Sequence, residues 1–364
     1  MTGLDHLAGL ESEIPDAPPA ELVVSPQSVD DVALVLRHAS EANRNVQVLG
    51  GGTHSGFGSP PPADIVMSVD RLTRVQTWEP EDLTMVVDAG ARVSDIEAML
   101  AEENQTAVLP EMPGASTIGG TIAAGVSSLR RGRLFGTRER VLEVTVVTGD
   151  GRVVRSGGRV VKNVTGYDIH RLHVGAFGSL GVVVSVCLKL WPTPPAAATV
   201  AVADLGQAKS AVRPLAVLED RTGLRVFVWG TDTEVAAKAE RLGGEVSQGH
   251  DWPADPQGRF RWSLRVPPAT TSEAVARIPQ SWPFLAIHGV GELRLGSEDL
   301  TGAADLRTWA ESNGGHLVLT DRPADFDEFD PWGAPPPGLE IQRTLIAEFD
   351  PKRVINPGRL PGGL

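Results

Sequence analysis

The sequence has a single cysteine and lacks long apolar runs. Cys187 alone can form no internal disulfide and cannot supply the four thiolates of an iron–sulfur or zinc cluster, so any such centre would lie on another chain. No stretch reaches the roughly 20 apolar residues that a membrane-spanning helix requires. Residues 1–19 are acidic and contain prolines, with neither a basic start nor an apolar run. We therefore expect a flexible N-terminus rather than a signal peptide, and a cytoplasmic protein.

Positive charge is also scarce. The chain carries 33 lysines and arginines against 46 aspartates and glutamates, which gives a formal net charge of -13. Nucleic-acid binding requires clustered cations that displace counterions, so this class of protein is excluded, and the acid excess favours solubility instead. With 364 residues, of which 41% are hydrophobic, the chain is long enough for two domains that each bury a core.

The first 110 residues have a pattern of alternating helices and strands. Ser28 and Asp31 have the spacing of a capping box, which predicts a helix that begins at Val29. Ser94 and Glu97 repeat that spacing before a second helix. Runs of β-branched and aliphatic residues predict strands at residues 46–49, 65–68 and 84–89.

Two proline-rich breaks divide the rest of the chain. Longer strands are predicted at residues 143–148, 152–155 and 182–191, and the breaks follow at residues 192–198 and 331–338. Between the breaks we expect a compact α+β unit, with strands at residues 224–229, 261–266, 284–288 and 316–320 and helices at residues 233–242 and 299–312. The expected domains are a first domain of two lobes (about 20–110 and 111–195), an inserted cap (196–335) and a segment that returns to the first domain (336–364).

The loop at residues 50–56 is the first candidate site. Consecutive glycines expose backbone N–H groups that can bind an anion such as a pyrophosphate, although a tight loop explains the same residues. The chain contains neither Gly-x-Gly-x-x-Gly nor a Gly-Lys pair. A Rossmann dinucleotide site and a P-loop are therefore excluded.

A dense run of small residues at 113–125 is the second candidate. Its backbone must lie close to something flat or bulky, either a ligand or a closely packed sheet. The following Arg130, Arg131 and Arg133 indicate an anionic ligand nearby or a solvated loop. A third candidate runs from Arg159 to Val183 and contains Tyr167, the one tyrosine of the chain, followed by a glycine-flanked turn and an apolar strand.

Taken in order, these segments resemble the FAD-binding half of the vanillyl-alcohol oxidase and p-cresol methylhydroxylase (PCMH) superfamily. The shared pattern is a glycine loop, Pro-Gly-x-x-Thr-Ile-Gly-Gly, Gly-Tyr-Asp, Gly-x-Leu-Gly-Val and a terminal Asn-Pro-Gly. Residues 162–168 and 349–360 further resemble the smaller FAD-binding subunit of bacterial glycolate oxidase. The resemblance covers roughly residues 22–192 and the C-terminal tail. It implies an α+β fold: a two-lobed PCMH-type FAD-binding domain with a smaller α+β cap inserted before the return segment.

The resemblance also implies which residues contact FAD. The first loop would hold the pyrophosphate, the second segment would lie along the pyrophosphate and isoalloxazine, and later residues would sit against the ribose, the adenine and the far edge of the flavin. The cofactor-binding residues are then Gly50, Gly51, Gly52, Thr53, His54, Ser55, Gly56, Pro113, Gly114, Ser116, Thr117, Gly119, Gly120, Ala123, Gly125, Tyr167, Gly181, Val182, Val183 and Asn356.

Several members of the superfamily attach FAD covalently through a histidine of the first loop. Their pattern is Gly-Gly-His-Ser, whereas Thr53 here stands between Gly52 and His54. We therefore expect non-covalent FAD.

The reaction that the resemblance implies is oxidation of a 2-hydroxy acid, with hydride transfer to the flavin. Arg130, Arg131 and Arg133 are candidates to hold the carboxylate, and His288 or His316 to take the hydroxyl proton. Related catalytic subunits resemble one another in a histidine and glutamate metal cluster in the cap, which is not found here, so no metal site is expected.

Three functions remain open. The first is an electron-transferring FAD subunit of a glycolate oxidase-like complex, with a larger FAD subunit and an iron–sulfur subunit as partners and association with the inner membrane only through them. The second is a stand-alone oxidase or dehydrogenase of an alcohol, sugar acid or hydroxy acid. The third is a scaffold subunit whose flavin is structural.

Overall fold

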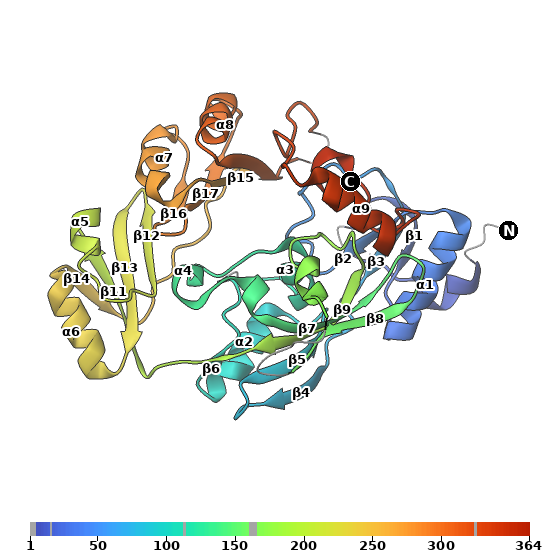
Figure 1. Cartoon of the computed structure of the whole chain (residues 1–364), viewed down its shortest axis with the longest axis horizontal. Coiled ribbons are helices and arrows are strands. Elements are labelled where there is room, and N and C mark those ends of the chain that lie inside the picture. The colour runs from blue at the N-terminus through green and yellow to red at the C-terminus, as the bar shows by residue number, and fades with distance from the viewer. Residues whose placement is uncertain (1–4, 15–16, 112–113, 160–165, 324–325) are drawn as a thin grey trace. The chain divides into compact units, whose positions relative to one another are not determined.

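The computed structural model describes residues 5–14, 17–111, 114–159, 166–323 and 326–364. The chain forms two compact units (Figure 1). The first unit comprises residues 1–127, 136–191 and 335–364, and the cap unit comprises residues 128–135 and 192–334. The segment 128–135 was expected in the first domain, but by its contacts it belongs to the cap unit. Within the described residues, none of the helices has the length and apolarity to span a membrane.

A three-stranded parallel sheet begins the first unit. Its order is β1 (Ala20–Val24), β3 (Ala63–Ser68) and β2 (Val46–Leu49), and α1 (Val29–Ala42) connects β1 to β2. The expected capping box is confirmed, because Ser28 accepts the N–H of Asp31 and Asp31 accepts the N–H of Ser28. The apolar face of α1 is buried in the core of the unit.

A second, antiparallel sheet shares that core. Its order is β4 (Val75–Glu79), β5 (Thr84–Asp88), β9 (Val182–Lys189), β7 (Val141–Val147) and β8 (Val153–Gly157). The expected division of the lobes near residue 110 is therefore wrong for β4 and β5, which pair with each other and, through β5, with the much later β9. Their local pattern could not reveal this, because strand pairing depends on partners distant in sequence.

The second predicted capping box does not form. Helix α2 (Val93–Glu102) starts after Arg92, which makes no side-chain cap. The backbone N–H of Val93 donates instead to the carbonyl of Ser116 at 2.9 Å. Glu97 accepts hydrogen bonds from the hydroxyl of Thr106 at 2.7 Å and from the N–H of Leu109 at 3.0 Å. A tertiary contact has thus replaced the local one.

Both ends of the chain pack on the first unit. Within the N-terminal segment that was expected to be flexible, residues 5–10 form the short 3-10 helix η1 (Asp5–Leu10), and its Leu7 is fully buried. After α9 (Leu339–Phe349), the tail runs beside β2, where Val46 donates to the carbonyl of Val354 at 2.7 Å. The remaining elements of this unit are α3 (Ile118–Ala124), β6 (Gln105–Thr106), η2 (Thr137–Glu139), η3 (Ile169–His173) and η5 (Pro361–Gly363). The two-residue strand β10 (Trp191–Pro192) pairs with β6 and contains the last residue of this stretch of the unit and the first residue of the next.

The cap unit is built on one antiparallel sheet of eight strands, in the order β14-β11-β13-β12-β16-β17-β15-β18. The four expected strands are present as β13 (Gly223–Gly230), β15 (Phe260–Arg265), β16 (Phe284–Ile287) and β18 (His316–Asp321). Sequence analysis missed the other four, which are β11 (Ala196–Val202), β12 (Ala216–Asp220), β14 (Glu245–Gln248) and β17 (Glu292–Ser297).

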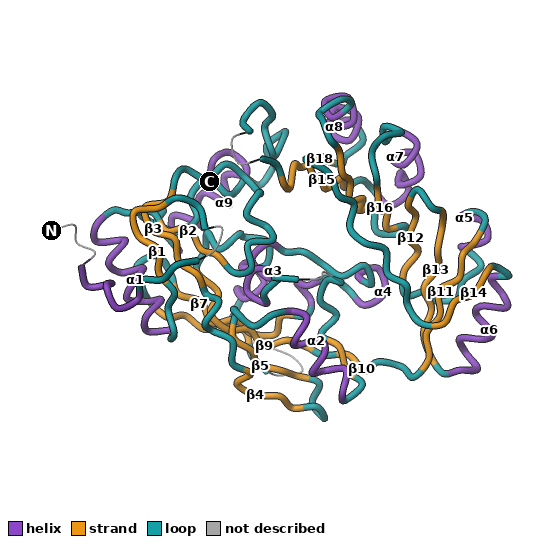
Figure 2. The backbone as a smooth tube through the Cα atoms, turned by 180° about the vertical axis from the view of Figure 1, so that it is seen from behind, coloured by secondary structure: helices purple, strands orange, loops and turns teal. Residues whose placement is uncertain are grey.

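Helices cover one face of this sheet. They are α5 (Leu205–Ala208), α6 (Asp232–Leu242), α7 (Thr271–Arg277) and α8 (Ala303–Ser312), with η4 (Pro268–Thr270) before α7. Their buried residues pack with those of the strands in two apolar clusters. Figure 2 shows these helices along one side of the sheet and the short α4 (Arg131–Leu134) on the other.

Candidate active site

A hollow in the first unit is the candidate site. It contains about 700 Å³ of space, part of which is open solvent. Four segments that are far apart in sequence line it. They are residues 48–55 at the end of β2 and in the loop that follows it, residues 119–124 of α3, residues 177–183 before and within β9, and Asn356 with Arg359 of the tail.

Absent side chains allow the first of these segments to touch residues 115–117, which precede α3. A Cβ on Gly51 would lie 1.5 Å from the carbonyl oxygen of Ala115, and one on Gly50 would lie 2.3 Å from the hydroxyl of Thr117. Ser116 also donates to the hydroxyl of Thr53, at 3.4 Å. The glycines at 50 and 51 therefore serve the packing of one loop on the other as well as the lining of the hollow.

The first loop lines this hollow and contains backbone N–H donors. For the N–H groups of Gly51, Gly52 and Thr53 we find no protein acceptor among the described residues. Gly52 has φ of 71°, a conformation that favours glycine, and a Cβ there would meet nothing within 4 Å. Consecutive N–H groups in such a turn form a concave anion site, which fits a pyrophosphate.

Helix α3 contributes two neighbouring glycines with different surroundings. A Cβ on Gly119 would lie 2.6 Å from the Cβ of Ala89, so this glycine permits the helix to pack against the end of β5. A Cβ on Gly120 would meet only the hydroxyl of Thr117, at 3.1 Å, although Gly120 lines the hollow. Gly119 thus agrees with the explanation of close packing, whereas Gly120 has space beside it that the explanation of room for a ligand requires.

Asn356 of the fourth segment is hydrogen-bonded to the first and third segments. Its backbone has φ of 46°, and its side-chain oxygen accepts the N–H of Val48 at 2.8 Å. Its side-chain nitrogen donates to the carbonyl of Phe177 at 2.7 Å. The amide therefore links β2, the turn before β9 and the tail around the hollow.

Arg359 was not among the residues expected at the site. It lines the hollow, is 4% exposed, and donates to the carbonyls of Ser55 and Phe57, the latter at 2.8 Å. Val69 and Phe177 also line the hollow without having been expected. Only the position of Arg359, three residues after Asn356, could have drawn attention to it.

The structure brings together many of the expected cofactor residues. Those that line the hollow are Gly50, Gly51, Gly52, Thr53, His54, Ser55, Gly119, Gly120, Ala123, Val182, Val183 and Asn356. Expected residues outside this lining are Gly56, Gly114, Ser116, Thr117, Gly125, Tyr167 and Gly181. Tyr167 is 89% exposed. Pro113 and residues 160–165 lie outside the described residues.

His54 of the first loop contacts one hydroxyl group and one aromatic ring. Its Nδ1 is 2.9 Å from the hydroxyl of Thr53, and its ring centroid is 6.1 Å from that of Phe57. Thr53 therefore makes a direct polar contact with the imidazole ring of His54, the residue type through which the covalent pattern attaches FAD.

The expected catalytic residues lie in the cap unit. Arg131 of α4 donates to Glu292 of β17 at 2.5 Å. The Nε2 of His288 is 2.6 Å from Glu219 of β12. His316 begins β18, where desolvation and the charge of Arg265 lower the pKa of its imidazole.

Other titratable groups of the first unit are buried away from the hollow. Desolvation lowers the pKa of His173 to about 4, and burial raises the pKa of Cys187 to about 11. The Cys187 thiol therefore stays protonated and unreactive at neutral pH. Within the described part of the chain, no group of three or more His, Cys, Asp or Glu side chains is placed to hold a metal ion.

Comparison with protein families gives a match to an FAD binding domain over residues 20–157. The chain is 29% identical to glycolate oxidase subunit GlcE of Escherichia coli, over 86% of this chain and 92% of that protein. It is 32% identical to glycolate oxidase subunit GlcD of Bacillus subtilis, over 50% of this chain and 38% of that protein.

D-lactate dehydrogenase of Archaeoglobus fulgidus is 30% identical, over 47% of this chain and 39% of that protein. This chain thus spans nearly all of GlcE but less than two fifths of the other two relatives. Among solved structures, an alkyldihydroxyacetonephosphate synthase superposes with a TM-score of 0.67 at 14% identity, over 93% of this chain and 76% of that one. That similarity shows the fold.

Proposed function

This chain is an FAD-binding oxidoreductase of PCMH-type fold, related to glycolate oxidase subunits, and from that premise we propose that it is the FAD-carrying subunit of a 2-hydroxy acid dehydrogenase complex. The observation that carries the proposal is the hollow of the first unit, in which separate stretches of bare backbone meet. The similarity to GlcE along nearly the whole chain supports the choice of complex.

In this proposal the chain's own residues hold the cofactor in three ways. The N–H groups of Gly51, Gly52 and Thr53 bind the pyrophosphate, the surface left bare by Gly120 lies against a flat part of the cofactor, and Asn356 keeps the surrounding segments in place. When bound, FAD supplies the two-electron acceptor that side chains alone do not provide.

The cap unit supplies the groups for the substrate. A cation must hold the carboxylate and a neutral base must take the hydroxyl proton. Arg131 is the candidate to hold the carboxylate. His316 is the candidate base, because the lowered pKa of His316 keeps its imidazole neutral at pH 7. His288 remains the other candidate base, with its Nε2 held by Glu219.

Anaerobic titration tests the proposed subunit role. Glycolate or D-lactate is added to the purified flavin-containing chain, alone and together with a larger FAD subunit and an iron–sulfur subunit, while the flavin absorbance is followed. Bleaching that requires the partner subunits supports the proposal. Bleaching of the chain alone identifies a stand-alone enzyme, and a flavin that no donor reduces identifies a scaffold; either result overturns it.

The mode of FAD attachment can be tested separately. We propose non-covalent FAD, because Thr53 displaces His54 from the covalent pattern and contacts its ring. Acid precipitation of the holoprotein is expected to leave all of the flavin in the supernatant. Yellow colour retained in the washed pellet would refute this mode.

A further inference from the structure

Two phenylalanine rings of the first unit meet at the hollow. Phe177 lines the hollow, and Phe57 follows the loop whose residues 50–55 line it. The centroids of the two rings are 4.9 Å apart, with an angle of 42° between the ring planes. Both residues are partly buried. The pair therefore places aromatic surface beside a hollow in which many of the lining residues have small side chains or none.

The backbone of Phe177 has a conformation that favours glycine. Its φ is 49°, at which the side chain of an L-residue crowds its own backbone. Its N–H donates to the carbonyl of Ala123 at 2.8 Å, and its carbonyl accepts from Nδ2 of Asn356 at 2.7 Å. Bulky residues persist in this region where their surroundings fix them, and such residues cluster at ligand sites. Because glycine adopts this conformation without strain, a phenylalanine here indicates a use for the ring.

The C-terminal tail positions both phenylalanines. Asn356 holds the carbonyl of Phe177, and Arg359, three residues later, donates from Nη1 to the carbonyl of Phe57 at 2.8 Å. Arg359 is itself only 4% exposed. Two side chains of one short segment thus fix the backbone of two residues that are far apart in sequence, and so bring their rings into contact.

We propose that the Phe57–Phe177 pair is the stacking surface for the adenine ring of FAD. This assignment rests on the proposed function and deepens it, because it names the part of the cofactor that these rings select. Aromatic side chains bind flat heterocycles by stacking on the face of the ring. The isoalloxazine must leave one face open to the hydride donor, whereas adenine takes no part in the reaction, so an aromatic wall suits adenine.

The position of the pair next to the proposed pyrophosphate donors supports this choice. Phe57 follows those donors in the same loop, and its ring centroid is 6.1 Å from that of His54. The imidazole of His54 in turn contacts the hydroxyl of Thr53, whose N–H is one of the donors. The pair thus adjoins the place where the phosphates are expected, and the adenosine extends from one of these phosphates.

Calorimetric titration of the flavin-free full chain with FAD, ADP and FMN tests the assignment. ADP carries adenine without the flavin, FMN carries the flavin without adenine, and both carry phosphate. Phe177→Leu keeps an apolar side chain at the same φ but loses the ring. It is expected to weaken the binding of FAD and ADP by at least about tenfold and to leave the affinity for FMN unchanged. Phe177→Tyr keeps the ring and should bind all three ligands like the wild type.

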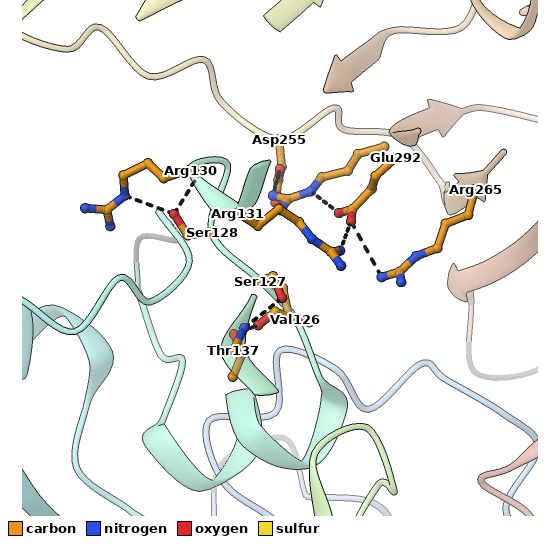
Figure 3. A network of polar contacts seen from close by, with 10 residues as sticks. Val126, Ser127, Ser128, Arg130, Arg131, Thr137, Asp255, Arg265 and Glu292 are labelled. Carbon is orange, nitrogen blue, oxygen red and sulfur yellow. Dashed lines mark hydrogen bonds and ion pairs between the residues drawn. The ribbon is translucent and has the colours of Figure 1, made fainter. Parts of the chain in front are cut away.

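Phe135→Leu is the matched control. Phe135 also has a positive φ, of 66°, but it is 61% exposed and does not line the hollow. It directly follows α4, whose Arg131 contacts Glu292 of β17 in the cap unit (Figure 3). This variant should bind FAD, ADP and FMN with wild-type affinity, which shows that loss of a phenylalanine with positive φ elsewhere has no such effect.

A purely structural role of the ring predicts a different pattern. If the ring only packs the first unit, Phe177→Leu weakens the binding of all three ligands alike and lowers the melting temperature of the unit. An equal loss for the three ligands, an unchanged FAD affinity, or a loss confined to FMN overturns the adenine assignment. Should Phe177→Leu fail to fold, Phe57→Leu removes the other ring of the pair and must show the same selective loss.

The assignment and the proposed function can fail separately. A wild-type chain that binds FAD and FMN equally tightly overturns the adenine assignment and leaves the flavin proposal intact. A wild-type chain that binds no FAD overturns the proposed function, and titration with ADP still decides whether the two rings bind adenine.

Discussion

At the scale of single residues, the two adjacent glycines of α3 have separable roles. Replacement of Gly120 by Leu puts a side chain into the hollow, where the Cβ meets only Thr117, and a helix interior favours Leu over Gly by about 1 kcal/mol. We expect Gly120→Leu to fold and to lose FAD, as measured by flavin absorbance and thermal melting.

Gly119→Leu is the matched comparison. Its Cβ would lie 2.6 Å from the Cβ of Ala89, so the main expected effect is a lower melting temperature of the first unit. A Gly120→Leu protein that retains its yellow colour would contradict the assignment of the hollow to FAD.

Asn356 should matter for stability as well as for the cofactor. Asn356→Ala removes both side-chain hydrogen bonds and leaves the N–H of Val48 without its acceptor, which costs about 2–4 kcal/mol of unfolding free energy. Urea denaturation measures the loss. Asn313→Ala is the control, because its amide bonds to the carbonyl of Trp309 at an exposed helix end. Equal losses in both variants would show that Asn356 has no special linking role.

At the scale of elements, packing of η3 against α9 should make the first unit sensitive to acid. The ring of His173 is 2% exposed and lies edge-on to Phe349, with centroids 5.9 Å apart. Its folded pKa of about 4 is below the unfolded value, so between about pH 6.5 and 4 only the unfolded state takes up the proton. The free energy of unfolding therefore decreases as the pH is lowered through this window, by about 3 kcal/mol.

Neighbouring groups modify this pH dependence without reversing it. Desolvation also lowers the pKa of His170, which adds to the effect. Burial raises the pKa of Asp350, which follows α9, so protonation of this carboxyl stabilises the folded state and opposes the effect. His173→Leu is expected to flatten the dependence of stability on pH between 6.5 and 4. An unchanged slope in urea titrations at several pH values would disprove the role of His173.

Prediction of elements succeeded where the signal was local. The capping box of α1 uses residues three apart, and the long apolar strands of both units have their own periodicity. Edge strand β14, whose residues are all exposed, has no apolar pattern to detect, and β11 begins in the proline-rich break. For Glu97, partners at residues 106 and 109 prevailed over the local cap.

At the scale of the whole molecule, each unit has its own apolar core, so the two are expected to unfold as separate calorimetric transitions. All residues that line the hollow belong to the first unit. FAD at 100 times its dissociation constant should stabilise that unit by about 2.7 kcal/mol and leave the cap transition in place. A single transition that moves as a whole on FAD addition would contradict this independence.

The sequence by itself determined the cofactor class and most of the loops that meet at the hollow. It could do so because glycine-rich motifs in a fixed order reflect local requirements of the backbone. It also located the cap and several of its strands from periodicity. Only the tertiary structure decided that Asn356 links three segments, that Arg359 joins the hollow, and that residues 128–135 belong to the cap. It likewise brought Arg131 to Glu292 and Arg265, since partners more than 100 residues apart in sequence leave no local pattern and are chosen by packing, charge and register.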